Sequence, residues 1–166
     1  ENLKLIWNFT KEFLTENEQK VLLRVENKAS ITALQHATIN KNPNSFLFVK
    51  EIYESFFTQS EIQEVLLKTY EDILPFFYDV IQDASLETAK EVAKFLKELF
   101  KGENLKLREI LSHRDSDGDT IFNWLKDDED YEQNLKLFVE LLRETFEDET
   151  QQFKEFFEKI SFRLLE

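Results

Sequence analysis

The chain has 166 residues, of which 42% are apolar and 33% are charged, and its formal net charge is −13. This composition excludes a disordered chain and a membrane-spanning protein, and the negative charge argues against a nucleic-acid partner. With no cysteine, two glycines and two histidines, the sequence lacks the residues for a disulfide framework, a multi-histidine metal centre, a nucleotide-binding loop or a nucleophile elbow, so we expect neither an enzyme nor a cofactor.

Helical periodicity begins near the N-terminus and recurs along the chain. Apolar residues stand three and four positions apart within residues 5–13, 92–99 and 150–165. This spacing predicts amphipathic helices, and no segment sustains the alternation of a strand, so the fold class is predicted to be all-α. Most of the 17 phenylalanines fall on such stripes, and we expect them mainly in the core, with an aromatic groove for a partner helix as the alternative.

A long internal period accompanies the helical pattern. Four segments combine two apolar, two polar and two mostly apolar positions; they are residues 9–14, 52–57, 95–100 and 141–146, spaced by 43, 43 and 46 residues. A second series, aligned at residues 22, 66, 111 and 157, is spaced by 44, 45 and 46 residues. Such a period indicates a stacked array of helical units. We expect a single domain over residues 1–166, with a partial repeat at 1–31 and repeats at about 32–73, 74–119 and 120–166.

One short motif resembles a known family. Residues 117–125 read Asp-Gly-Asp-Thr-Ile-Phe-Asn-Trp-Leu, which is similar to the ankyrin-repeat signature Asp-Gly-x-Thr-Pro-Leu-His-x-Ala. Earlier in the chain, four residues stand at the Thr, Leu, His and Ala positions of that signature, namely Thr32, Leu34, Gln35 and Ala37. The resemblance implies stacked helical hairpins. Because ankyrin units have 33 residues, the longer period predicts an additional helix in each unit, for example at 61–68 and 104–111; HEAT or armadillo repeats fit the period equally well.

The signature also implies how the helices begin. Its threonine normally caps the first helix, so Thr32 and Thr120 are predicted N-caps, and Pro75 suits a first helical turn. Gly118 is expected in a left-handed conformation in the turn before Thr120. The acidic residues 115–119 partly match a calcium loop, but the chain has Thr and Lys where an EF-hand requires Gly and Glu, so we expect a turn without a metal ion.

The expected function is a non-catalytic protein–protein interaction module. The resemblance implies a contact set in the turns and along the first helices of the units: Lys28, Ser30, Ile31, Gln35, Ile39, Ser116, Asp119, Asn123, Asp127 and Asp128. The alternative is an all-helical carrier that binds an apolar ligand in a phenylalanine-lined cavity. A hydrophobic dye or a native mass spectrum separates the two, because only a carrier retains lipid.

Charge is concentrated toward the C-terminus. Residues 115–166 carry 16 acidic and 6 basic side chains, a net charge of −10, and residues 127–130 are an unbroken acidic run. This run is either a solvated segment that keeps the protein in solution or an electrostatic surface for a basic partner. We therefore expect the partner to be another protein, with a basic surface if this segment takes part. We expect no nucleic acid, no membrane span and an intracellular, cytoplasmic location.

Overall fold

The computed structural model describes residues 2–28, 30–67 and 80–103, together with Lys106, Gln133 and Lys136. Within these residues the labelled helices are α1 (Asn2–Phe13), α2 (Glu16–Leu23), α3 (Ala33–Thr38), α4 (Pro43–Phe56), α5 (Gln59–Leu67) and α7 (Leu86–Leu99). Residues 80–83 are also helical. None of the described residues lies in a strand, and the prediction of an all-α chain is confirmed.

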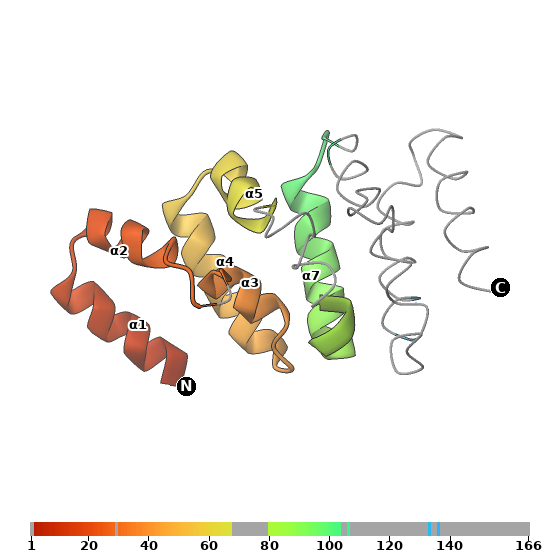
Figure 1. Cartoon of the computed structure of the whole chain (residues 1–166), viewed down its shortest axis with the longest axis horizontal. Helices are drawn as coiled ribbons and strands as arrows, with labels where there is room; N and C mark the ends of the chain where they lie inside the picture. The colour runs from red at the N-terminus through yellow and green to blue at the C-terminus, as the bar shows by residue number, and fades with distance from the viewer. Residues whose placement is uncertain are drawn as a thin grey trace.

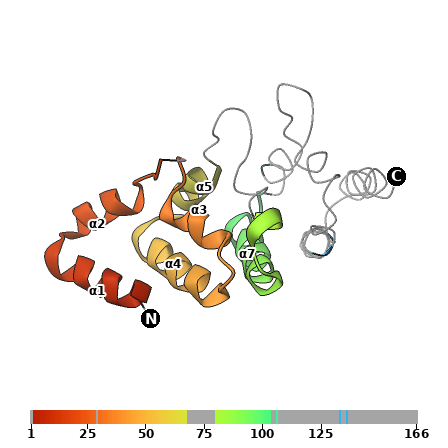
Figure 2. The same cartoon turned by 60° about the horizontal axis from the view of Figure 1, so that its bottom comes forward.

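The longer helices α1, α4 and α7 follow one another across the molecule in chain order (Figure 1). The α1–α2 pair lies at one end, α4 lies next to it, and α7 lies beyond α4 in both views (Figures 1 and 2). The short helix α3 packs on α4 and also contacts α7, and α4 contacts α7 directly. The predicted additional helix over 61–68 is present as α5, which begins two residues earlier than expected.

The core is formed mainly by α3, α4, α5 and α7. Its fully buried side chains include Leu34, Phe46, Tyr53, Leu66 and Leu96. The apolar residues of α4 and α7 recur at intervals of three and four, which gives each helix one apolar face that packs against its neighbours. The rings of Phe46 in α4 and Phe95 in α7 meet edge to face with centroids 5.8 Å apart. This is a favourable geometry for two aromatic quadrupoles.

Side-chain caps define where several of these helices begin. Thr15, Thr32 and Ser85 each accept a hydrogen bond from a backbone N–H in the first turn of the helix that follows, while Asn42 caps α4 ahead of Pro43. Such bonds satisfy donors that have no partner within the helix. The prediction that Thr32 is an N-cap is confirmed.

Two expectations about the first helix have different outcomes. The stripe at residues 5–13 does form a helix, but α1 buries none of its residues. The prediction that phenylalanines lie mainly in the core is right for Phe46 and Phe95 and wrong for Phe9 and Phe13, whose side chains are exposed. The reason is positional, because α1 lies at the end of the row of described helices and has a neighbour on one side only (Figure 1).

Several predictions concern residues outside the described part of the chain. They include the cap at Thr120, Pro75 in a first helical turn, the left-handed Gly118, the acidic turn at 115–119 and, apart from Lys106, the additional helix at 104–111. The contact residues Ser116, Asp119, Asn123, Asp127 and Asp128 also lie there.

Candidate interaction surface

The turn that precedes α3 is held by three hydrogen bonds. The backbone N–H of Asn27 donates to the Ile31 carbonyl at 3.0 Å, and the N–H of Ser30 donates to the Asn27 carbonyl at 3.0 Å. The N–H of Ile31 donates to Oδ1 of Asn27 at 3.1 Å. Ser30 has φ 56, the left-handed conformation that closes a tight turn. These bonds connect Asn27 to Ser30 and Ile31, and Lys28 is exposed while Ser30 and Ile31 are half-buried.

Gln35 has a structural role at the start of α3. Its Oε1 accepts hydrogen bonds from the backbone N–H and the hydroxyl of Thr32, both at 2.9 Å, while Oγ1 of Thr32 accepts from the Gln35 N–H at 3.3 Å. This reciprocal pair is a capping box. Both residues are buried, so Gln35 leaves almost no side-chain surface for a partner.

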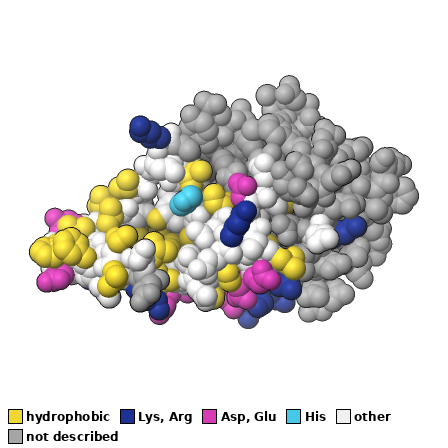
Figure 3. All heavy atoms as spheres, turned by 90° about the horizontal axis from the view of Figure 1, so that it is seen from below, with side chains coloured by type: hydrophobic (Ala, Val, Ile, Leu, Met, Phe, Trp, Pro, Cys, Tyr) yellow, Lys and Arg dark blue, Asp and Glu magenta, His cyan; other side chains and the backbone are white. Residues whose placement is uncertain are grey.

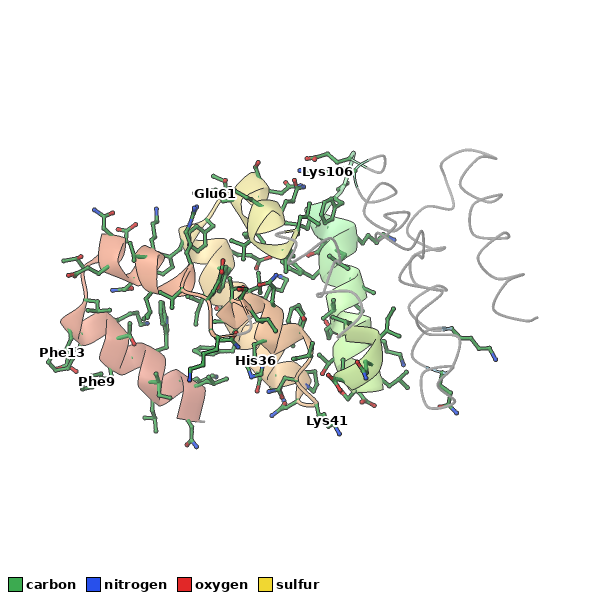
Figure 4. All side chains as sticks on the ribbon, in the orientation of Figure 1. Phe9, Phe13, His36, Lys41, Glu61 and Lys106 are labelled. Carbon is green, nitrogen blue, oxygen red and sulfur yellow. The ribbon has the colours of Figure 1, made fainter. Side chains whose placement is uncertain are left out.

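The outer face of α3 and the segment after it present other side chains than those in the predicted contact set. Ile39 packs partly against the core, whereas Ala33, His36 and Lys41 are exposed. Figure 4 shows His36 on α3 and Lys41 on the connection to α4. The sequence could have identified this exposed face of α3, because Leu34 and Ala37 mark the opposite, buried face of the same short helix.

A second exposed surface lies on the first two helices and is apolar. We call it the N-terminal apolar surface; its large side chains are Leu3, Leu5, Ile6, Phe9, Phe13, Val21, Leu22 and Val25. Seen from below, hydrophobic side chains gather at this end of the molecule (Figure 3). Phe9 and Phe13 point away from α2 and α4 (Figure 4), and their rings contact each other with centroids 4.4 Å apart.

The exposed residues of α1 have buried counterparts in α4 and α7. At the 43-residue spacing of the sequence, Phe9 corresponds to Ile52 and Phe95, which are 63%, 8% and 2% exposed in that order. Ile6 corresponds in the same way to Val49 and Val92, both of which are buried. The exposed face of α1 therefore has the same apolar pattern as the faces of α4 and α7, which neighbouring helices cover.

Side chains far apart in the sequence join α2 to α5. Nη2 of Arg24 lies 2.7 Å from Oε1 of Glu61, and the Arg24 guanidinium lies over the ring of Phe57 at 5.1 Å. Glu61 also accepts hydrogen bonds from the backbone N–H of Thr58 at 2.9 Å and from its hydroxyl at 3.0 Å. The Thr58 N–H, the Thr58 hydroxyl and the Arg24 charge hold the pKa of Glu61 below its usual range. Because both charged side chains are substantially exposed, the ion pair itself adds little stability.

A buried amide, that of Gln63, joins α5 to the end of α7. Nε2 of Gln63 donates to the Leu99 carbonyl at 2.8 Å, and Oε1 of Gln63 accepts from Nζ of Lys106 at 2.7 Å. Gln63 is almost fully buried, and both ends of its amide have partners. These bonds satisfy a carbonyl at a helix C-terminus and fix α5 against α7.

The described residues contain no visible site for a metal ion. Among residues 2–28, 30–67 and 80–103, no three His, Asp or Glu side chains come close enough together to hold one. No helix in these ranges is long and apolar enough to cross a bilayer. The aromatic side chains of the interior pack on one another, as Tyr53 and Phe57 do with centroids 5.4 Å apart.

Comparison with known proteins gives no match. No protein-family model matches the chain, and no curated protein or solved structure is significantly similar to it. The surfaces of the chain itself are therefore the basis on which its function is inferred.

Proposed function

We propose that the chain is a non-catalytic protein–protein interaction module built from stacked, ankyrin-like helical units with an additional helix in each. The observation that carries the proposal is the matched burial of α4 and α7, whose equivalent residues 43 positions apart, such as Ile52 and Phe95, are both buried. A helix packed at the same register in successive units is what a repeat array requires. The helix α5 supports the lengthened unit, and a HEAT-like array remains the alternative arrangement.

The contact surface in this proposal is the turn at 28–31 with the outer face of α3. Its support is that the turn is already fixed by three hydrogen bonds in the free chain. A preformed turn loses little conformational entropy when it binds, so more of the contact energy contributes to affinity. Lys28 and His36 are exposed, so both side chains are available to a partner at this edge of the molecule.

The acidic segment supplies the second part of the proposed surface. A partner with a basic surface is attracted by the net charge of −10 on residues 115–166. Neutralising the acidic run with Asp127→Asn, Asp128→Asn, Glu129→Gln and Asp130→Asn should slow association more than it speeds dissociation, because exposed charges act mainly on the encounter step. A cytoplasmic location stays a prediction.

Affinity capture with quantitative mass spectrometry tests the proposal. The full chain is compared with Lys28→Glu in the turn and with Lys90→Glu on α7, which makes the same charge change at another exposed lysine. We expect a defined protein to be captured by the wild-type chain and by the α7 variant, and its recovery to fall about tenfold or more with the turn variant. Equal recovery by both variants would place the contact elsewhere. Lipid retained in a native mass spectrum would favour a carrier instead.

A further inference from the structure

We propose that the N-terminal apolar surface pairs with the same surface of a second copy of this chain, so that two copies form a symmetric dimer. The surface comprises the eight exposed residues of α1, α2 and the segment just after α2 defined above. This pairing does not rest on the proposed partner site, because Lys28 and His36 are not among those residues.

The size of the surface is the first argument. Eight apolar side chains that are 43–67% exposed leave roughly 300–550 Å² in contact with water, given that fully burying a side chain of this kind removes about 60–120 Å² of apolar area. A single exposed apolar patch on a soluble monomer rarely exceeds about 300–600 Å². A stable interface needs about 800 Å² from each partner. Because little more than half of such an interface is apolar, its apolar part is about 450 Å² from each partner, which the eight side chains together can supply.

The internal packing indicates what kind of element covers such a surface. Phe95 of α7 is buried against Phe46 of α4, so the counterpart of Phe9 is covered by another helix of the same series. Because α1 belongs to that series by its 43-residue spacing, the α1 helix of a second copy carries a matching apolar stripe. A twofold axis brings the two stripes together, since a symmetric interface uses one surface twice.

Charge does not oppose pairing between copies through residues 1–25. Residues 1–25 contain four acidic and four basic side chains and so are neutral, although the whole chain carries −13. Within α1, the exposed residues Leu5, Phe9 and Phe13 recur every four positions, on one face of the helix. Two copies can therefore meet through residues 1–25 without repulsion between the net charges of these segments.

Sedimentation velocity on the full chain over a range of micromolar concentrations tests the pairing. We expect the mass to rise from 19.9 kDa toward twice that value with concentration. The double variant Phe9→Glu, Phe13→Glu should raise the dimer dissociation constant by about 100-fold or more, because it puts charges at the centre of an apolar interface. Circular dichroism should be unchanged, since both side chains are already exposed. Leu47→Glu on α4 is the matched control and should still dimerise.

Spin labels locate the interface independently. The chain has no native cysteine, so Leu5→Cys introduces a single labelling site. A label there should report a short distance between copies, whereas a label at Leu86→Cys on α7 should not. The proposal is overturned if the chain stays monomeric throughout, if a dimer forms that ignores the Phe9 and Phe13 changes, or if the surface is covered by a lipid vesicle or by a different protein's helix instead of a second copy.

Discussion

The phenol of Tyr53 donates a hydrogen bond to the backbone carbonyl of Leu23, and the two residues lie 30 positions apart in the sequence. Both are buried, so the bond joins α4 to the C-terminal end of α2 away from water. It is the polar counterpart of the exposed Arg24–Glu61 link between α2 and α5. Burial raises the pKa of the Tyr53 phenol, which keeps it protonated and able to donate.

Replacing Tyr53 with Phe removes this donor and little else. The change should lower the free energy of unfolding by about 1–3 kcal/mol, because the Leu23 carbonyl is left buried without that partner. Urea denaturation measures the difference. Ser55→Ala on the same helix is the control, since the exposed Ser55 hydroxyl donates only to the Ile52 carbonyl nearby. If both changes lower the free energy of unfolding by the same amount, the bond between α2 and α4 adds no more stability than a local bond within one helix.

The capping box at the start of α3 gives a second prediction. Thr32→Ala should destabilise the chain by about 1 kcal/mol, because it leaves a first-turn donor of α3 without its side-chain acceptor. Thr32→Ser keeps the hydroxyl and should recover most of that loss. The exposed box at Thr15 has the same chemistry, and Thr15→Ala should cost less because water can replace the missing bond. Thermal or urea unfolding of the three variants measures how much stability each of them loses.

The ankyrin resemblance predicts the start of α3 at Thr32, and the structure shows a local reason for it, the capping box with Gln35. A threonine followed three residues later by glutamine reports its own helix start, whatever surrounds it. The ankyrin resemblance placed Gln35 in the contact set, but its amide is committed to Thr32 in the structure. A family signature marks positions, whereas the hydrogen bonds of each side chain depend on neighbours that a signature does not specify.

Periodicity predicted that α1 is a helix and did not predict its exposure. The stripe of α1 has the same spacing as those of α4 and α7, and only the tertiary neighbours distinguish Phe9 from Phe95. The contacts Arg24–Glu61 and Tyr53–Leu23 likewise join residues 37 and 30 positions apart. No local pattern encodes such pairs, because they arise from how the helices pack.

Acid should weaken the fold through Glu61. Hydrogen bonds from the Thr58 backbone and hydroxyl, together with Arg24, hold the pKa of this carboxyl below its ordinary value of 4.5. A pKa lowered in the folded state means that the ionised group stabilises the fold above pH 4.5, and that this contribution is lost as pH falls through the folded pKa. Glu61→Gln should therefore be less stable than wild type near neutral pH, with the difference closing in acid.

Urea denaturation across this pH range measures the effect of Glu61. Arg24→Ala should keep most of the pH dependence, because the Thr58 backbone bond is the largest cause of the lowered pKa and the arginine is a smaller one. A wild-type–Glu61→Gln difference that stays constant through the acid range would show that the Glu61 charge has no favourable environment in the fold.

Equivalent phenylalanines in α1 and α7 should lose very different amounts of stability on truncation. Phe95 is 2% exposed and meets Phe46, so Phe95→Ala should cost about 3–5 kcal/mol through lost burial and the cavity left behind. Phe9 is 63% exposed at the corresponding position, and Phe9→Ala should change the stability of the monomer by less than about 0.5 kcal/mol. Urea denaturation is measured at low protein concentration, so that pairing between copies does not contribute to the free energy of unfolding. A large loss with Phe9→Ala under those conditions would mean that α1 is already covered within the monomer, and would remove the surface on which the proposed dimer depends.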